Sequence, residues 1–104
     1  MTAMALDEKT TTVVRFATTT KETKEMQAAA RALKAKEVIL RAWGTWSNDR
    51  GEVVDLTATG MPIKEVRSVW VEASIQGHWI RLRPNNDPHL PESATPKIQV
   101  EVTF

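Results

Sequence analysis

Two runs of alternating apolar and polar residues, separated by Gln76-Gly77, constrain the fold of this chain more than any other feature. They make up the stretch VWVEASIQGHWIRLR at residues 69–83. An alternation with a period of two is typical of β-strands, and glycine tolerates the positive φ that a two-residue hairpin turn requires. The stretch therefore predicts a β-hairpin in which Glu72 lies opposite Arg81 and Ser74 lies opposite Trp79.

The two faces of this predicted hairpin differ in polarity. The apolar face, which we expect to join the core, carries Val69, Val71, Ala73 and Ile75 opposite Pro84, Leu82, Ile80 and His78. The other face carries Trp70 opposite Arg83, in addition to the pairs named above. Because opposed pairs of this kind stabilise a sheet, we expect an ion pair between Arg81 and Glu72. We also expect a cation–π contact between Arg83 and the Trp70 ring.

The tryptophans and arginines of the polar face allow three interpretations. They can form the ordinary solvent side of a sheet, since each arginine has a partner there. They can stack under the bases and hold the phosphates of single-stranded nucleic acid. They can also form a protein interface, because tryptophan and arginine are enriched in interface hot spots. We adopt the interface hypothesis and extend it to two tryptophans of another predicted strand, so that the predicted interface residues are Trp70, Trp79, Arg81, Arg83, Trp43 and Trp46.

One helix is predicted near the N-terminus, at residues 19–36. Thr19 followed by Glu22 fits a capping box, in which each side chain satisfies a free amide of the first turn. The residues that follow, KETKEMQAAARALKAK, are mostly strong helix formers. The apolar side of this helix is thin, so contacts with other elements must hold it in place. That side consists of Met26, Ala29, Ala30 and Leu33.

The rest of the chain has the pattern of short strands between turns. Residues 38–43 and 52–58 alternate around a predicted hairpin loop at 47–51, and residues 59–62 are a predicted turn. Four prolines across 84–96 forbid a regular ladder there. The closing stretch KIQVEVTF alternates without exception, and its predicted core side consists of Ile98, Val100, Val102 and Phe104.

These elements predict a single, mainly β (α+β) domain. Five or six strands between tight turns favour an antiparallel β-sandwich or a small barrel, with one N-terminal helix. Residues 1–18 are expected to form a polar arm with a short strand, residues 19–36 the helix, and residues 37–104 the antiparallel β domain. A polar, threonine-rich arm needs the domain or a neighbouring molecule to order it.

Composition narrows the chemistry that is available to the chain. No cysteine is present among the 104 residues, which removes disulfides and thiolate ligands. Asp87, His89 and Glu92 are too few and too closely spaced for a typical metal site, and no motif marks a nucleophile or a phosphate loop. We therefore expect no catalytic site, no metal and no cofactor. The net charge of +1 argues against nucleic acid as a partner, and no segment is apolar over the length of a bilayer.

The segment GEVVDLTATGMPIKEVRSVWVEAS and the final strand KIQVEVTF resemble, in style, the small β-rich virion proteins of tailed bacteriophages. That group comprises capsid decoration (cement) proteins and head or tail accessory proteins. The resemblance implies a non-enzymatic structural role, with many copies bound to themselves or to other virion proteins, as a homo-oligomer or on a lattice. It also implies location in the virion, after assembly in the host cytoplasm; otherwise we expect a cytoplasmic protein. A single-stranded nucleic-acid-binding small barrel is the alternative function.

Overall fold

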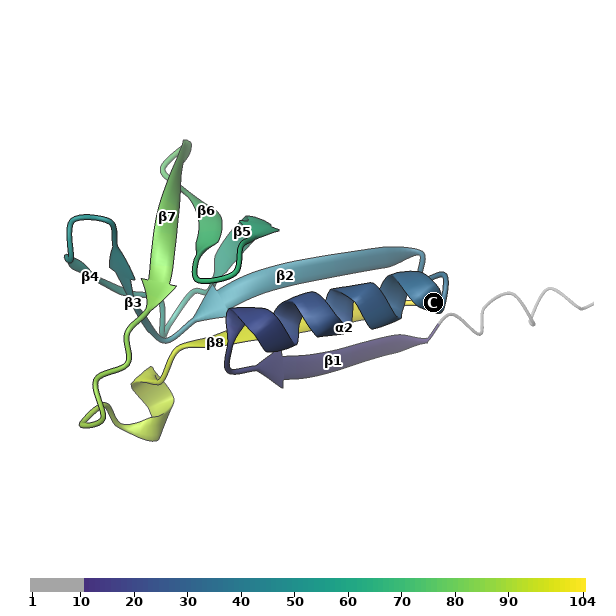
Figure 1. The fold of residues 1–104 in the computed structure, drawn as a ribbon, viewed down its shortest axis with the longest axis horizontal. Coiled ribbons are helices and arrows are strands. Elements are labelled where there is room, and N and C mark those ends of the chain that lie inside the picture. Colours follow the sequence, from purple (N-terminus) through teal and green to yellow (C-terminus); the bar gives the residue numbers. More distant parts are fainter. Residues whose placement is uncertain (1–10) are drawn as a thin grey trace, which may run out of the picture.

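The computed structural model describes residues 11–104, in which a sheet of eight strands carries one α-helix (Figure 1). Residues 1–10, most of the predicted polar arm, lie outside the described residues. The strands are β1 (Thr12–Ala17), β2 (Glu37–Trp43), β3 (Thr45–Asn48), β4 (Val53–Asp55), β5 (Met61–Val66), β6 (Val71–Ile75), β7 (His78–Pro84) and β8 (Lys97–Thr103). The helix is α2 (Thr20–Ala32), and a short 3-10 helix, η1 (Glu92–Ala94), lies in the proline-rich loop.

The strands form an open sheet in the order β1-β8-β2-β5-β6-β7-β3-β4, and every pairing is antiparallel. The mainly β class with one helix is therefore confirmed for the described residues. The predicted five or six strands are too few, and the sheet is open rather than a sandwich or a closed barrel. β1 is the short strand that was expected in the arm. Of the two strands that were not expected, one is β3, which is separate from β2 because Gly44, with φ +87, lies between them.

The other unexpected strand is β5, which follows the predicted turn at residues 59–62. The turn closes at Gly60, whose backbone N–H donates to the Leu56 carbonyl at 3.1 Å, and β5 begins at the next residue. Pro62 has no N–H for a ladder, which argued against a strand at this position. In the structure Pro62 pairs with Arg41 where β5 leaves β2, and β5 continues beside β6.

The helix α2 lies along the three strands β1, β8 and β2 (Figure 1). The predicted alternation of β8 is confirmed, because Ile98, Val100 and Val102 are buried while the residues between them are half-buried. Leu40 and Ala42 of β2 are buried with them. The helix contributes little apolar area of its own. Burial of this continuous apolar surface of the sheet therefore holds the helix in place.

The helix begins as predicted and ends earlier. The Thr19 hydroxyl accepts a hydrogen bond from the Glu22 backbone N–H at 3.0 Å, which is one half of the predicted capping box. Leu33 is the C-cap, and Lys34 follows with φ 59. The predicted end at residue 36 is therefore wrong: the left-handed residue stops the helix, and the Lys36 N–H donates to the Thr103 carbonyl of β8 at 2.7 Å instead.

The strands β5, β6, β7, β3 and β4 lie beyond the N-terminal end of α2 (Figure 1). The chain enters this part through Gly44, between β2 and β3, with φ +87. A Cβ at this glycine would lie 2.3 Å from the Thr95 carbonyl oxygen, so only glycine fits. The core continues into this part through Trp46, Leu56, Val66, Val71, Ala73 and Leu82, all of which are buried.

The hairpin β6–β7 forms in the predicted register. Glu72 pairs with Arg81, and Ser74 pairs with Trp79. The turn residues Gln76 and Gly77 have φ 51 and φ 84, the two positive values that a type I′ turn requires. Most of the predicted apolar face is buried or half-buried, but Val69 and His78 are exposed. Val69 and His78 lie at opposite ends of the hairpin, where they do not pack against the buried core residues.

Trp46 is the largest side chain that is fully buried, with 1% of its surface exposed. Replacement of Trp46 by alanine is expected to cost about 3–5 kcal/mol of unfolding free energy, because it removes the packing and leaves a cavity. The same change at Trp79, which is 52% exposed, is expected to cost less than about 1 kcal/mol. Urea unfolding followed by circular dichroism compares the two, and loss of the folding transition in the Trp46 variant counts as the large effect. Equal costs would contradict the burial of Trp46.

Candidate functional site

The outer face of the β6–β7 hairpin exposes tryptophan and arginine, as the interface hypothesis requires. Trp79 is 52% exposed, and the Nζ atom of Lys64 from β5 lies 5.1 Å from its ring centroid. Trp70 is half-buried, and Cζ of Arg81 lies 4.9 Å from its ring centroid. Each ring thus holds a cation from its own chain on one side, a contact worth about 0.5–1 kcal/mol at exposed sites.

The predicted partners of the two arginines are wrong. Arg81 stacks on Trp70, although we predicted Arg83 for that ring. Trp70 precedes β6 and closes a turn, in which its carbonyl accepts a hydrogen bond from the Arg67 N–H at 2.7 Å. Because the ring is outside the strand register, it reaches the diagonal arginine. Within residues 11–104, the ion pair that forms is between Arg67 and Glu65 at 3.2 Å, and Glu72 has none.

A polar cavity of about 340 Å³ lies between this hairpin face and the first half of α2. Its lining comprises three cations, one carboxylate, a serine and a tryptophan: Lys24, Arg67, Arg81, Glu72, Ser68 and Trp70. The indole Nε1 of Trp70 is buried and has no hydrogen-bond partner among residues 11–104. The helix is tied to this corner by the Thr20 hydroxyl, which donates to the Ser68 carbonyl at 2.7 Å.

The other two predicted interface tryptophans do not extend the hairpin face. Trp46 is in the core, where its Nε1 donates to the Trp43 carbonyl at 2.7 Å, so its assignment to the interface is wrong. Trp43 is half-buried, and its Nε1 donates to the Gln99 side-chain oxygen at 3.1 Å. Its ring lies above Gly60, where an added Cβ would approach within 2.8 Å. Trp43 therefore belongs to β2 and to a different face.

That different face is a surface that the sequence analysis missed. On the side of β1, β8 and β2 opposite α2, three large apolar side chains remain exposed: Val14 at 49%, Phe16 at 50% and Ile39 at 39%. We name this side the open face and define it by Val14, Phe16, Glu37, Ile39, Arg41, Trp43, Lys97, Gln99 and Glu101. A solvated sheet face normally carries polar residues, so several exposed apolar residues on one face indicate a binding surface. The sequence does not show that these residues share a face, because it does not show that β1 pairs with β8.

The edge beside the open face is also free. β1 is the terminal strand of the sheet, so one side of its backbone has no ladder partner among the described strands. Such edges pair readily with other chains unless they are protected. An apolar face that ends in an unprotected edge is a surface suited to protein contact.

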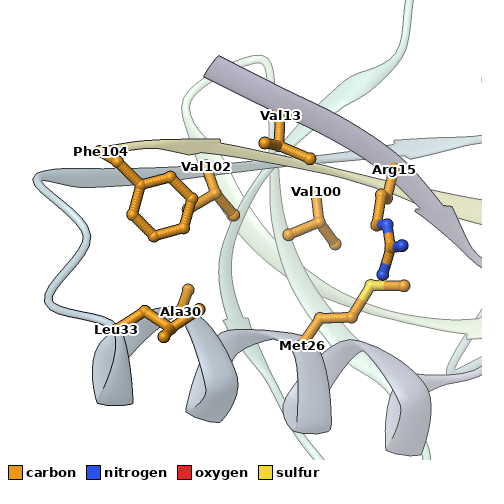
Figure 2. A pocket seen from close by; sticks show the side chains of 8 residues that line it. All are labelled: Val13, Arg15, Met26, Ala30, Leu33, Val100, Val102 and Phe104. Atoms are coloured by element: carbon orange, nitrogen blue, oxygen red, sulfur yellow. The ribbon is translucent and has the colours of Figure 1, made fainter. Parts of the chain in front are cut away.

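A third apolar surface lies between α2 and the sheet. Figure 2 shows Met26, Ala30 and Leu33 of the helix facing side chains of β1 and β8 across an open groove. The groove has a volume of about 210 Å³. It exists because Ala30 is small and Leu33 lies at the helix end, 67% exposed. The thin apolar side that the sequence predicted for the helix is the cause of this gap.

Asp87 and Asp55, the carboxylates that are candidates for a metal ligand and an acid–base group, are engaged in local hydrogen bonds in the described part of the chain. No group of three or more potential metal ligands comes together within residues 11–104. The Asp87 carboxylate instead accepts a hydrogen bond from the His89 backbone N–H at 2.9 Å. The hydroxyl and backbone N–H of Thr57 donate to Asp55 and hold the pKa of that exposed carboxyl below its ordinary value. A carboxylate of this kind is a poor general acid.

In the described residues, no helix combines the length and the apolar character that crossing a bilayer needs. The chain matches no protein-family model, no curated protein and no solved structure.

The Arg81–Trp70 contact predicts a difference between two arginines on one strand face. Arg81→Ala is expected to lower the free energy of unfolding by about 0.5–1 kcal/mol, since it removes the cation–π contact and the packing of the arginine stem. Arg83→Ala is the matched control, because the cation–π contacts found within residues 11–104 involve Lys64, Arg81 and Lys97 and not Arg83. Urea unfolding of both variants measures the difference. A larger loss for Arg83→Ala would support the pairing predicted from the register instead.

Proposed function

We propose that this protein is a non-enzymatic assembly protein that acts through protein–protein contacts, in a symmetric homo-oligomer or bound to a protein lattice. The open face is the observation that carries this proposal. Its exposed apolar side chains are Val14 and Phe16 of β1 and Ile39 of β2, the two strands that flank β8, and the edge of β1 that has no partner among the described strands adjoins them. Val14 and Phe16 are neighbours on β1, and Ile39 lies across Glu101 from Val14. Exposed apolar side chains with polar residues around them are typical of a binding surface.

The open face and the hairpin face are two separate candidate binding surfaces, which supports a subunit that contacts more than one neighbour. The open face is the side of β1, β8 and β2 opposite α2. The hairpin face with Trp70 and Trp79 belongs to β6 and β7, at the other end of the strand order. A protein that is repeated in a ring or on a lattice needs contacts on separate sides. A virion component, such as a capsid decoration protein or a head or tail accessory protein, is the form of this function that we propose.

The alternative, a binding module for single-stranded nucleic acid, finds less support. Stacking platforms offer free aromatic faces next to cations. Here Arg81 already occupies one side of Trp70, and Lys64 lies over Trp79. The predicted phosphate ligand Arg81 is therefore engaged with the ring under which a base would stack.

The assembly proposal predicts that polar replacements on the open face weaken self-association. Val14→Thr together with Ile39→Thr keeps β-branched residues in both strands, so the fold should persist, while the apolar contact is lost. We expect the dissociation constant of the oligomer to rise at least about tenfold. Light scattering over a range of concentrations, at low and high salt, measures the molar mass.

The matched control is Val53→Thr together with Val69→Thr. Both valines are exposed, at 66% and 52%, and both lie away from the open face. The control should keep the wild-type dissociation constant. Wild-type protein that stays monomeric at every concentration, but binds oligonucleotides with an affinity that falls steeply with salt, would favour the nucleic-acid alternative.

A further inference from the structure

The charged residues of the open face are sorted by sign along the strands. The register aligns Glu37 with Thr103, Ile39 with Glu101, Arg41 with Gln99 and Trp43 with Lys97. Four successive rows thus cross β2 and β8. The two rows at one end carry Glu37 and Glu101, and the two rows at the other end carry Arg41 and Lys97.

Contacts inside the chain do not account for this separation. In the described part of the chain, the ion pair that forms is Arg67–Glu65, which is not on this face. The Lys97 ammonium lies 4.9 Å from the Phe16 ring centroid and forms no ion pair with a carboxylate of the described residues. Glu101 and Lys97 are half-buried, and within residues 11–104 neither has an ion-pair partner.

We propose that a second copy of this chain packs face to face on the open face, with its strands antiparallel to those of the first. This inference rests on the proposed function and specifies its partner and geometry. Two sheets that pack on each other by a twofold axis must have that axis in the plane between them. The sorted charges select the direction of the axis within that plane.

An axis that runs along the strands would place glutamate rows on glutamate rows. An axis that runs across the strands reverses the row order, so that acidic rows meet basic rows. When that axis lies midway along the four rows, Glu101 is level with Arg41 of the partner subunit, one strand to the side. Glu37 is then level with the partner's Lys97, also one strand to the side.

These separations are suited to ion pairs. Neighbouring strands are about 4.8 Å apart and packed sheets about 10 Å apart, a distance that two long side chains span together. By symmetry, the dimer contains four such pairs. The same axis places Val14 over the partner's Phe16, so that apolar side chains meet along β1 and the ion pairs lie along β2 and β8.

Charge reversal tests this geometry. One variant, Glu37→Lys with Glu101→Lys, has a wholly basic open face; the other, Arg41→Glu with Lys97→Glu, has a wholly acidic one. Each alone should form dimers with a dissociation constant at least about tenfold higher than that of the wild type, because like charges meet. An equimolar mixture should restore dimers, since every acidic side chain again meets a cation. Light scattering and sedimentation over roughly 1 µM to 1 mM cover the range expected of a small interface.

A control matched to the basic variant makes the same change in net charge at exposed positions off the open face. Glu25→Lys with Glu92→Lys should leave the dissociation constant unchanged. Should a reversed variant fail to fold by circular dichroism, Glu37→Gln with Glu101→Gln and Arg41→Gln with Lys97→Gln replace the pair. Each neutral variant should then weaken the dimer and reduce its dependence on salt.

The outcomes separate this inference from the proposed function. Restoration by mixing supports the antiparallel dimer. If the dissociation constant of the oligomer is the same for the wild type and all of these charge variants, the dimer geometry is overturned. The assembly role then stays, with its contact on another surface. Two variants that are each monomeric and stay so when mixed also overturn the geometry. Wild-type protein that is monomeric throughout overturns both the dimer and the homo-oligomeric form of the proposed function.

Discussion

The insertion of β8 between β1 and β2 is the interaction on which the rest of the structure depends. Seven register pairs join β8 to β2 and six join it to β1. Its buried residues, Ile98, Val100 and Val102, form the surface on which α2 lies. The last strand of the chain thus closes a sheet begun by the first, so this half of the core forms only after the most distant segments have met. Contacts of such long range slow folding.

The same strand links the fold to the proposed role. Strict alternation along β8 sends one set of side chains under α2 and the other set, including Glu101 and Lys97, to the open face. One helix covers one side of this three-stranded sheet, and within residues 11–104 no α-helix covers the other side, on which Val14, Phe16 and Ile39 are exposed. The apolar residues there come from β1 and β2, which join a common surface only because β8 separates them by one strand. A single pairing therefore creates both the core and the candidate interface.

The four tryptophans show that residue type alone does not determine whether a side chain lies in the core or on a surface; its position in the fold does. Four residues of one kind divide among the core (Trp46), the open face (Trp43) and the hairpin face (Trp70 and Trp79). Trp46 follows Gly44, whose left-handed backbone turns the chain into the second half of the core. Trp46 is an even number of residues from the buried Leu40 and Ala42, so strand alternation alone already places it on the core side and Trp43 on the other. The interface on the hairpin face stays a prediction, and its extension to Trp43 and Trp46 is wrong because neither tryptophan lies on that face.

The sequence by itself determined the features that depend on neighbouring residues: the hairpin turn at Gln76-Gly77 with its register, the Thr19 cap, and the two faces of β8. Turn geometry and period-two alternation act over a few residues, so they can be read locally. Only the tertiary structure decided the strand order, the open sheet in place of a barrel, the strand at Pro62, and the early helix end at Lys34. Each of these depends on which distant segment supplies a hydrogen bond or an apolar contact, and no local pattern specifies that partner. The open face is of this second kind, because its residues become neighbours only when the strands pair.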